Sequence, residues 1–235
     1  SKDQGETLAC RLTWLCHTTK HRPSMIFDET TLAGAFLLRP ERHADERGHF
    51  ARTFCRREFE AHGLEPMVAQ CSVSFNDAAG TLRGMHYQAA PHGEAKLVRC
   101  TRGAVYDVII DLRPDSDTYG QHFGAVLSAD NGHALYVPEG IAHGFLTLKD
   151  RSEVYYQMNT FHEPEAARGV RWDDPAFNIH WPQPVRVIKE RDATYPDFVP
   201  AAPLRRSRSM LIPAIHRVVE SGAGAGQTEA IGVPT

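Results

Sequence analysis

The chain contains short apolar runs that recur at regular intervals and are separated by turn-forming residues. Between residues 96 and 159 these runs are four to nine residues long, with glycine, asparagine, aspartate or serine between them. Runs of this length and spacing are typical of strands in a β-sandwich or barrel. We therefore predict an all-β fold, with a short helix over residues 56–62 that ends at Gly63.

Three pairs of neighbouring runs are predicted to form hairpins, because a short polar loop joins the two runs of each pair. Arg102-Gly103 joins residues 96–101 to 104–112, Asn131-Gly132 joins 124–127 to 134–137, and residues 149–152 join 142–148 to 153–159. If each pair lies in one sheet, the residues that face each other follow from counting outward from the loop.

The counting brings two sets of polar side chains together. Lys96 and Asp107 become diagonal neighbours on the face to which Val98 points, where unpaired charges would be costly to bury. This arrangement indicates either a polar pocket or a structural ion pair. The third hairpin places Tyr156 on the same face as His143.

The segment GTLRGMHYQ (residues 80–88) is bounded by glycine, is too short for a helix, and surrounds a histidine with an arginine, an aromatic residue and an amide. We interpret it as a strand that presents His86 to a cavity as a base. Strict alternation would send Arg83 and His86 to opposite faces. A bulge at Gly84 would bring both to one cavity, since glycine inside a strand often marks a bulge.

The composition points to an ordinary soluble protein of the cytoplasm. A formal net charge of -3 gives no reason to expect nucleic acid or an anionic membrane as partner. The five cysteines are scattered and lack CxxC spacing, so neither a disulfide framework nor a zinc site is expected. No apolar run approaches the roughly 20 residues of a membrane span. We predict a mobile N-terminal extension (residues 1–24), one folded domain (residues 25–204) and a flexible C-terminal tail (residues 205–235).

Several motifs, in order along residues 26–200, resemble the dTDP-4-dehydrorhamnose 3,5-epimerases. These are nucleotide-sugar epimerases with the cupin fold, a double-stranded β-helix or jelly roll. The motifs are DERG (45–48), GTLRGMHYQ (80–88), AKLVR (95–99), YDV (106–108), VPEGIAHGF (137–145), WDDP (172–175) and IHWP (179–182). The resemblance implies an all-β cupin domain, a nucleotide-diphosphate sugar as substrate, and a homodimer.

The resemblance also implies roles for individual residues. His86 is similar to the family's proton-abstracting base, Asp192 to the carboxylate that orients it, and Tyr156 to the general acid on the other side of the sugar ring. Lys96 is similar to the cation beside the enolate oxygen. The positions that resemble substrate-binding residues are Arg47, Gln70, Arg83, His143 and Arg191. Gln88, which lies near His86 in the sequence, and Asp107, the predicted neighbour of Lys96, are further substrate-binding candidates.

The implied reaction inverts C3 and C5 of dTDP-4-dehydro-6-deoxy-glucose, giving dTDP-4-dehydro-rhamnose for deoxysugar biosynthesis. Epimerisation next to a ketone needs a base, a positive group for the enolate, and an acid on the opposite face. Histidine, lysine and tyrosine supply these three. The substrate's own carbonyl receives the electrons, so we expect no cofactor.

The chain departs from the family pattern on the side that binds nucleotide and sugar. The family usually has Gln-x-Asn where this chain has Gln70-Cys71-Ser72, while Arg52 and Ala167 occupy positions that are acidic in the family. These changes leave open an epimerase that inverts only C3 or acts on another nucleotide sugar.

Two alternatives of other classes also remain. A metal-dependent cupin isomerase or dioxygenase would use a His-x-His pair, but Gln88 replaces the second histidine, so no metal site is expected. The other alternative is a cupin that binds a sugar nucleotide without catalysis.

Overall fold

The computed structural model of the protein describes residues 25–200. The predicted extension (residues 1–24) and tail (residues 205–235) lie outside the described residues. In the part that is described, no helix combines the length and apolar character needed to cross a bilayer.

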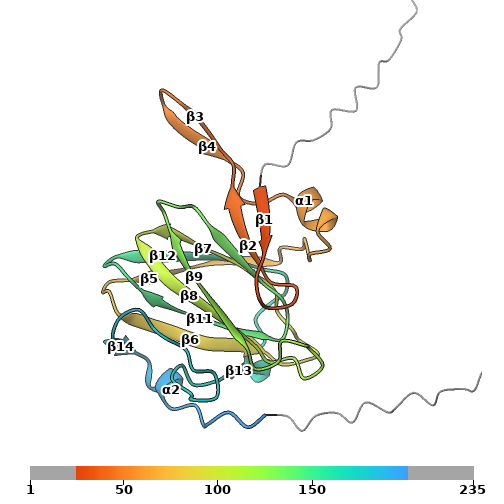
Figure 1. Ribbon diagram of the computed structural model, residues 1–235, viewed down its shortest axis with the longest axis vertical. Helices are drawn as coiled ribbons and strands as arrows, with labels where there is room; N and C mark the ends of the chain where they lie inside the picture. The colour runs from red at the N-terminus through yellow and green to blue at the C-terminus, as the bar shows by residue number, and fades with distance from the viewer. Residues whose placement is uncertain (1–24, 201–235) are drawn as a thin grey trace, which may run out of the picture. The chain divides into compact units, whose positions relative to one another are not determined.

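Two six-stranded sheets pack face to face and form a jelly roll, which confirms the predicted all-β cupin class (Figure 1). All strand pairs are antiparallel except β14 with β6. The first sheet has the order β1 (Met25–Glu29), β2 (Phe36–Pro40), β10 (Ala134–Val137), β7 (Lys96–Arg102), β12 (Ser152–Met158), β5 (Gln70–Asn76). The second has β13 (Ala167–Gly169), β6 (Thr81–Gln88), β11 (Ile141–Thr147), β8 (Ala104–Asp111), β9 (His122–Ser128), with β14 (Val187–Ile188) beside β6.

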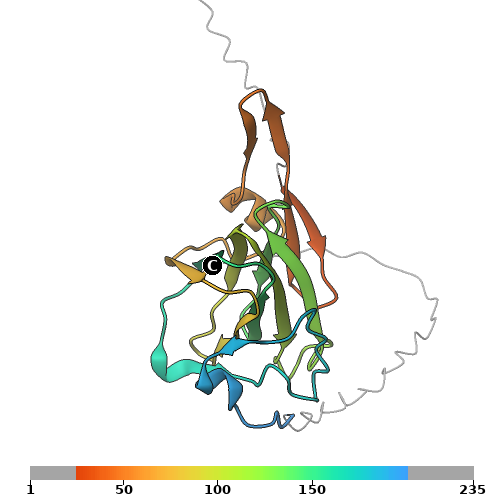
Figure 2. The same cartoon turned by 90° about the vertical axis from the view of Figure 1, so that its left-hand side faces the viewer.

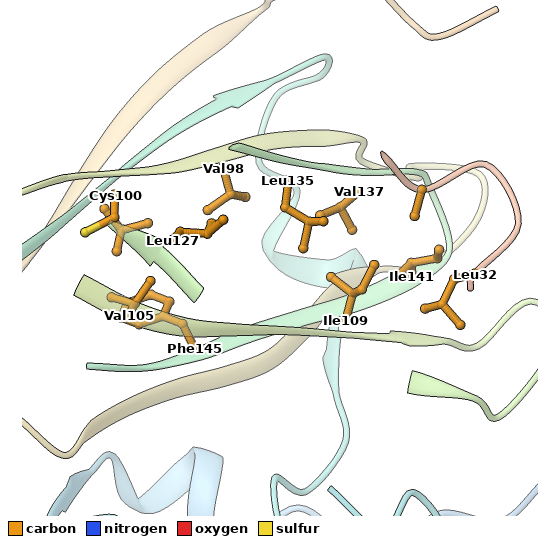
Figure 3. Close-up of a cluster of buried hydrophobic side chains, with 12 residues drawn as sticks. Leu32, Val98, Cys100, Val105, Ile109, Leu127, Leu135, Val137, Ile141 and Phe145 are labelled. Carbon is orange, nitrogen blue, oxygen red and sulfur yellow. The ribbon is translucent and has the colours of Figure 1, made fainter. Parts of the chain in front are cut away.

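The main hydrophobic core lies between the two sheets (Figure 3). Alternation along β8 sends Ile109 into this core and its neighbours Val108 and Ile110 to the opposite face. That outer face is covered by residues of the C-terminal segment, including Val170 and Phe177. Because both faces of β8 are buried, its sequence is almost continuously apolar rather than alternating.

The predicted hairpin between residues 96–101 and 104–112 is wrong. β7 pairs with β10 and β12, whereas β8 pairs with β9 and β11 in the other sheet. Gly103, with φ of 74°, lies where the chain passes from one sheet to the other. Each of the two strands has apolar side chains along one face. When the strands pack face to face in different sheets, both apolar faces are buried, so Val98 and Ile109 belong to the same core.

The predicted neighbours Lys96 and Asp107 are consequently not paired. Lys96 forms an ion pair with Glu94, and Asp107 pairs with His143. Both buried charges therefore have partners, as physical chemistry requires, but these partners are not the ones that the predicted hairpin implied.

The other two predicted hairpins are wrong for the same reason. β11 and β12 flank residues 148–151 but lie in different sheets, and β9 and β10 also lie in different sheets. The turn at Asn131 does form, since its side chain accepts a hydrogen bond from the Ser128 backbone N–H at 3.0 Å and donates one to the Val126 carbonyl at 2.9 Å. Loop chemistry predicted the turn correctly without predicting which strands become neighbours.

Smaller elements surround the sandwich. β3 (Arg42–Asp45) and β4 (Gly48–Ala51) form a hairpin that projects from the sheets, as both views show (Figures 1 and 2). The predicted helix is confirmed as α1 (Arg56–Ala61), and Gly63 follows it with φ of 69°. The remaining short elements are the 3₁₀ helix η1 (Pro164–Ala166) and the helix α2 (Glu190–Ala193).

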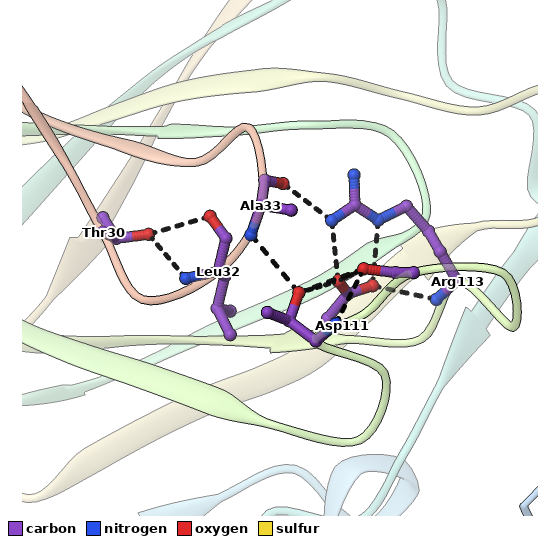
Figure 4. Close-up of polar contacts among 7 residues, drawn as sticks. Thr30, Leu32, Ala33, Asp111 and Arg113 are labelled. Atoms are coloured by element: carbon purple, nitrogen blue, oxygen red, sulfur yellow. Dashed lines mark hydrogen bonds and ion pairs between the residues drawn. The ribbon is translucent and has the colours of Figure 1, made fainter.

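A buried carboxylate, Asp111 at the end of β8, joins two loops at one end of the sandwich (Figure 4). It accepts hydrogen bonds from Arg113 at 2.7 Å and from the hydroxyls of Ser116 and Thr118, both at 2.6 Å. Arg113 also donates to the Ala33 carbonyl at 2.7 Å. The β8–β9 loop is thereby fastened to the β1–β2 loop.

Candidate active site

The main cavity, of about 560 Å³, lies between the two sheets and is bordered by β14 and α2. Seven of the eleven predicted site residues line it: Arg83, His86, Lys96, His143, Tyr156, Arg191 and Asp192. Cationic and aromatic side chains from both sheets therefore converge on one space, an arrangement suited to a small anionic ligand.

A bulge in β6 brings Arg83 and His86 to this cavity, as predicted. His143 of β11 faces His86, while Phe145 faces Arg83, so two steps along β11 correspond to three steps along β6. Gly84 lies within the extra step with φ of 140°, and a Cβ there would come within 2.5 Å of the Gly144 Cα. Only glycine allows the two strands to approach this closely.

The imidazole of His86 is held by the carboxylate of Asp192. His86 Nε2 lies 2.8 Å from Asp192 Oδ1, and the Gly84 backbone N–H donates to Oδ2 at 3.4 Å. Arg191 donates to Oδ1 at 3.1 Å. Although burial raises the pKa of Asp192, hydrogen bonds from His86 and Arg191 outweigh it and hold the pKa below its usual value.

The same nitrogen of His86 also lies 3.1 Å from Arg191 Nη2. A neutral imidazole nitrogen either donates or accepts, so it cannot form hydrogen bonds with both partners in one tautomer. With the proton on Nε2 the ring donates to Asp192, and Nδ1 becomes the basic nitrogen. The carboxylate thus favours the tautomer with the proton on Nε2.

Tyr156 reaches the cavity from the opposite sheet and lies beside His143, with ring centroids 6.1 Å apart. The shared environment of these two residues was predicted, but its origin is different: β11 and β12 face each other across the cavity. Burial raises the pKa of the Tyr156 hydroxyl, Asp107 raises it further, and Arg83 opposes the shift. At neutral pH the hydroxyl therefore keeps its proton and can donate it.

His143 is fixed from behind by Asp107. Its Nε2 lies 3.0 Å and 3.1 Å from the two carboxylate oxygens, and both side chains are buried. Burial raises the pKa of Asp107, and the interaction with His143 works against this rise. Asp107 itself does not line the main cavity, so its contribution to the site is to hold His143.

The remaining predicted binding residues lie away from the main cavity. Arg47 lies at the turn of the β3–β4 hairpin, 81% exposed and paired with Asp45. Gln70 begins β5 opposite Met158. Gln88 is buried, and its side chain bonds the backbone of His92, Phe161 and Glu163, accepting from the Glu163 N–H at 2.6 Å.

A second cavity of about 430 Å³ adjoins the first, and His86, Lys96 and Arg191 line both. Among the other residues that line it are Glu94 and His162, which sequence reasoning did not select. Glu94 could have been selected from the sequence, because in an extended chain the side chains of residues 94 and 96 lie on the same side. Within residues 25–200 no group of three or more His, Cys, Asp or Glu side chains is arranged to hold a metal ion.

Comparison with known proteins gives one consistent result. The family model for dTDP-4-dehydrorhamnose 3,5-epimerase matches residues 29–199. An enzyme of that name from Sinorhizobium fredii is 40% identical over 175 residues, covering 74% of this chain and 90% of the relative. Another from Methanothermobacter thermautotrophicus is 42% identical over 173 residues, covering 72% and 92%.

Solved structures show the same similarity. The dTDP-4-dehydrorhamnose 3,5-epimerase from Bacillus anthracis with TDP and PPi bound has a TM-score of 0.72 at 38% identity, covering 74% of this chain and 99% of that one. A 3'-monoepimerase from Streptomyces bikiniensis in complex with dTDP-quinovose has a TM-score of 0.67 at 32% identity, covering 72% and 85%.

Proposed function

Because this chain belongs to the dTDP-4-dehydrorhamnose 3,5-epimerase family, we propose that it inverts C3 and C5 of dTDP-4-dehydro-6-deoxy-glucose to give dTDP-4-dehydro-rhamnose. The observation that carries this proposal is the cavity in which a carboxylate-held imidazole, an ammonium group and a protonated phenol converge from two sheets. The product would serve deoxysugar biosynthesis in the cytoplasm.

His86 acts as the base in this proposal. With Nε2–H directed to Asp192, Nδ1 removes the proton from the carbon next to the C4 ketone, and the buried carboxylate stabilises the resulting imidazolium. The electron pair of the broken C–H bond moves into the ketone, giving an enolate at the C4 oxygen. Lys96, which lines the same cavity, supplies positive charge for that oxygen.

Tyr156 acts as the acid. It approaches the cavity from the first sheet, whereas His86 approaches from the second, so the two groups can serve opposite faces of one sugar ring. Its raised pKa keeps the proton available until the enolate carbon takes it up. Return of a proton from the face opposite to the base inverts the centre.

The cations at the cavity wall bind the diphosphate in this account. Arg83 and Arg191 are the two arginines that line the cavity, and bidentate guanidinium groups suit phosphate oxygens. We assign His143, held by Asp107, to the sugar. Arg47 and Gln70 would contact the nucleotide, and Gln88 supports the wall of the second cavity.

We also propose that the protein is a homodimer. Arg47 lies on a hairpin that projects from the sandwich, so within one chain it does not line the cavity (Figure 2). A second copy could bring this hairpin to a neighbouring cavity. Sedimentation equilibrium of the full chain at micromolar concentration should give twice the monomer mass, and a monomer at all concentrations would contradict this assignment.

A C3-only epimerase is the second candidate. The similarity to a 3'-monoepimerase supports it. Ala167 supports it as well, because this residue lines the second cavity and replaces an acidic residue of the family. Deuterium from solvent would then enter the substrate at C3 and not at C5. A metal-dependent cupin reaction would instead be recognised by loss of activity on treatment with a chelator, and a silent binding cupin by ligand binding without exchange.

The experiment that tests the proposed role of His86 compares His86→Ala with His180→Ala, which removes an exposed histidine outside the cavity. Proton NMR in deuterated buffer measures solvent exchange at C3 and C5, and calorimetry measures binding of dTDP. We expect His86→Ala to abolish exchange and leave dTDP binding within about threefold, while His180→Ala behaves as wild type. Retained exchange in His86→Ala would remove His86 from the mechanism.

A further inference from the structure

Glu94 and Lys96 form an ion pair at the wall shared by the two cavities. Glu94 Oε1 lies 2.6 Å from Lys96 Nζ, and the two side chains are only 8% and 11% exposed. Lys96 lines both cavities, whereas Glu94 lines only the second. The carboxylate therefore approaches the ammonium group from the side away from the main cavity.

The backbone between the two charges is fixed. The Ala95 N–H donates to Asn159 Oδ1 at 2.8 Å, and the Asn159 N–H donates to the Ala95 carbonyl at 3.2 Å. Glu94 and Lys96 thus project to the same side of an anchored extended segment, so little additional ordering is needed for the pair to form.

Neither charge has another ion-pair partner among residues 25–200. A buried ammonium or carboxylate alone carries a large desolvation cost, which the pair removes. A lysine side chain has four rotatable bonds, so an unpaired Lys96 would spread its ammonium group over several positions at the cavity wall. An ammonium has three N–H donors, and contact with one carboxylate oxygen leaves donors for a ligand in the main cavity.

We propose that Glu94 is a positioning residue, which holds Lys96 Nζ at the junction of the two cavities so that the ammonium group meets the developing C4 enolate oxygen. This inference rests on the role proposed above for Lys96. Glu94 itself does not touch the reacting atoms. The expected effect follows from the steep dependence of catalysis on placement, since a displacement of about 1 Å can cost roughly a hundredfold in rate.

The test uses Glu94→Gln, which keeps the length of the side chain and removes its charge, and Glu94→Asp, which keeps the charge. We expect Glu94→Gln to lower kcat by roughly tenfold to a hundredfold with KM within about threefold, and Glu94→Asp to recover part of the loss. Asp130→Asn is the matched control, because it removes a carboxylate from the exposed pair with Lys149. It should leave kcat unchanged.

Two further readouts separate positioning from a purely structural role. With substrate deuterated at C3, the isotope effect on kcat should rise in Glu94→Gln, because proton abstraction becomes slower relative to other steps. In a Lys96→Met background, Glu94→Gln should cause no additional loss of kcat, because the residue acts through the missing ammonium. If Glu94→Gln lowered kcat by the same factor in the wild-type and Lys96→Met backgrounds, the proposal would be overturned. A Glu94→Gln variant with the kcat of wild type would overturn it as well.

An NMR measurement tests the placement of Lys96 independently of activity. The ¹H–¹⁵N signal of the Lys96 ammonium, assigned by its absence in Lys96→Met, should be visible in wild type and lost through water exchange in Glu94→Gln. If the wild type shows the signal but fails to epimerise, and the signal is lost in Glu94→Gln, the proposed function is contradicted and the placement by Glu94 is supported. Wild-type turnover with an unchanged signal in Glu94→Gln would contradict the placement and leave the function standing.

Discussion

Replacing Asp192 with asparagine removes a negative charge beside His86 and changes the side chain's shape very little. The two groups are 2.8 Å apart, with Asp192 4% exposed and His86 36% exposed. Unit charges 4 Å apart attract each other by about 4 kcal/mol at an effective dielectric constant near 20. Because the imidazole is partly exposed, solvent screening reduces this value, and we expect about 3 kcal/mol of lost stabilisation for the imidazolium.

This loss appears in the rate because the imidazolium exists only after proton abstraction. About 3 kcal/mol corresponds to a roughly hundredfold lower kcat, at about 1.4 kcal/mol per factor of ten. An asparagine that offers its N–H₂ to Nε2 would also favour the wrong tautomer of His86, which acts in the same direction. KM should change little, because Asp192 stabilises a charge that develops only during the reaction and not in the bound substrate complex.

The assay is the rate of deuterium incorporation at C3 and C5, followed by proton NMR in deuterated buffer. Asp173→Asn is the control, because Asp173 is an aspartate of the exposed surface that pairs with Arg171 outside the cavity. Exchange by Asp192→Asn within threefold of wild type would refute the argument that the carboxylate stabilises the charged base.

Two further predictions concern the acid and the stability of the fold. Tyr156→Phe should retain solvent exchange while net inversion falls at least tenfold, because His86 can return a deuteron to the face from which it took the proton. Proton NMR measures exchange and inversion in one sample, and an equal fall of both would contradict the acid role. Asp111 has its pKa held at about 2, because hydrogen bonds from Arg113, Ser116 and Thr118 outweigh the effect of burial. Its contribution of about 2 kcal/mol is present above the unfolded pKa near 4 and is lost as pH falls toward 2. Urea unfolding at pH 7 should therefore show Asp111→Asn less stable by about that amount, with a smaller difference at pH 3; an equal difference at both pH values would contradict the assignment.

The fold class could be predicted from the sequence because strand length and turn residues are local properties. Short apolar runs with glycine and asparagine between them indicate an all-β sandwich, and the sheets contain them. Strand neighbours could not be predicted in this way. The turns at Gly103 and Asn131 form, yet the strands that they join lie in different sheets, because burial of two inward apolar rows outweighs pairing along the chain.

The site shows the same division between local and distant information. The bulge at Gly84 follows from the sequence, since a glycine between Arg83 and His86 offers the one position where the strand can take an extra residue. Asp192 is 106 residues from His86 in the chain, and no local pattern links them. Its place rested on family resemblance, and the geometry brings the two together. Glu94 was not selected from the sequence because an acidic residue near the end of a strand is usually exposed to solvent.

The measurement that tests the central claim most directly is proton NMR of the wild-type protein with dTDP-4-dehydro-6-deoxy-glucose in deuterated buffer without added metal. The account predicts deuterium at both C3 and C5 together with the signals of dTDP-4-dehydro-rhamnose. Deuterium at C3 alone would point to the single-centre epimerase. Unchanged substrate, in a protein that binds dTDP, would contradict the proposed reaction.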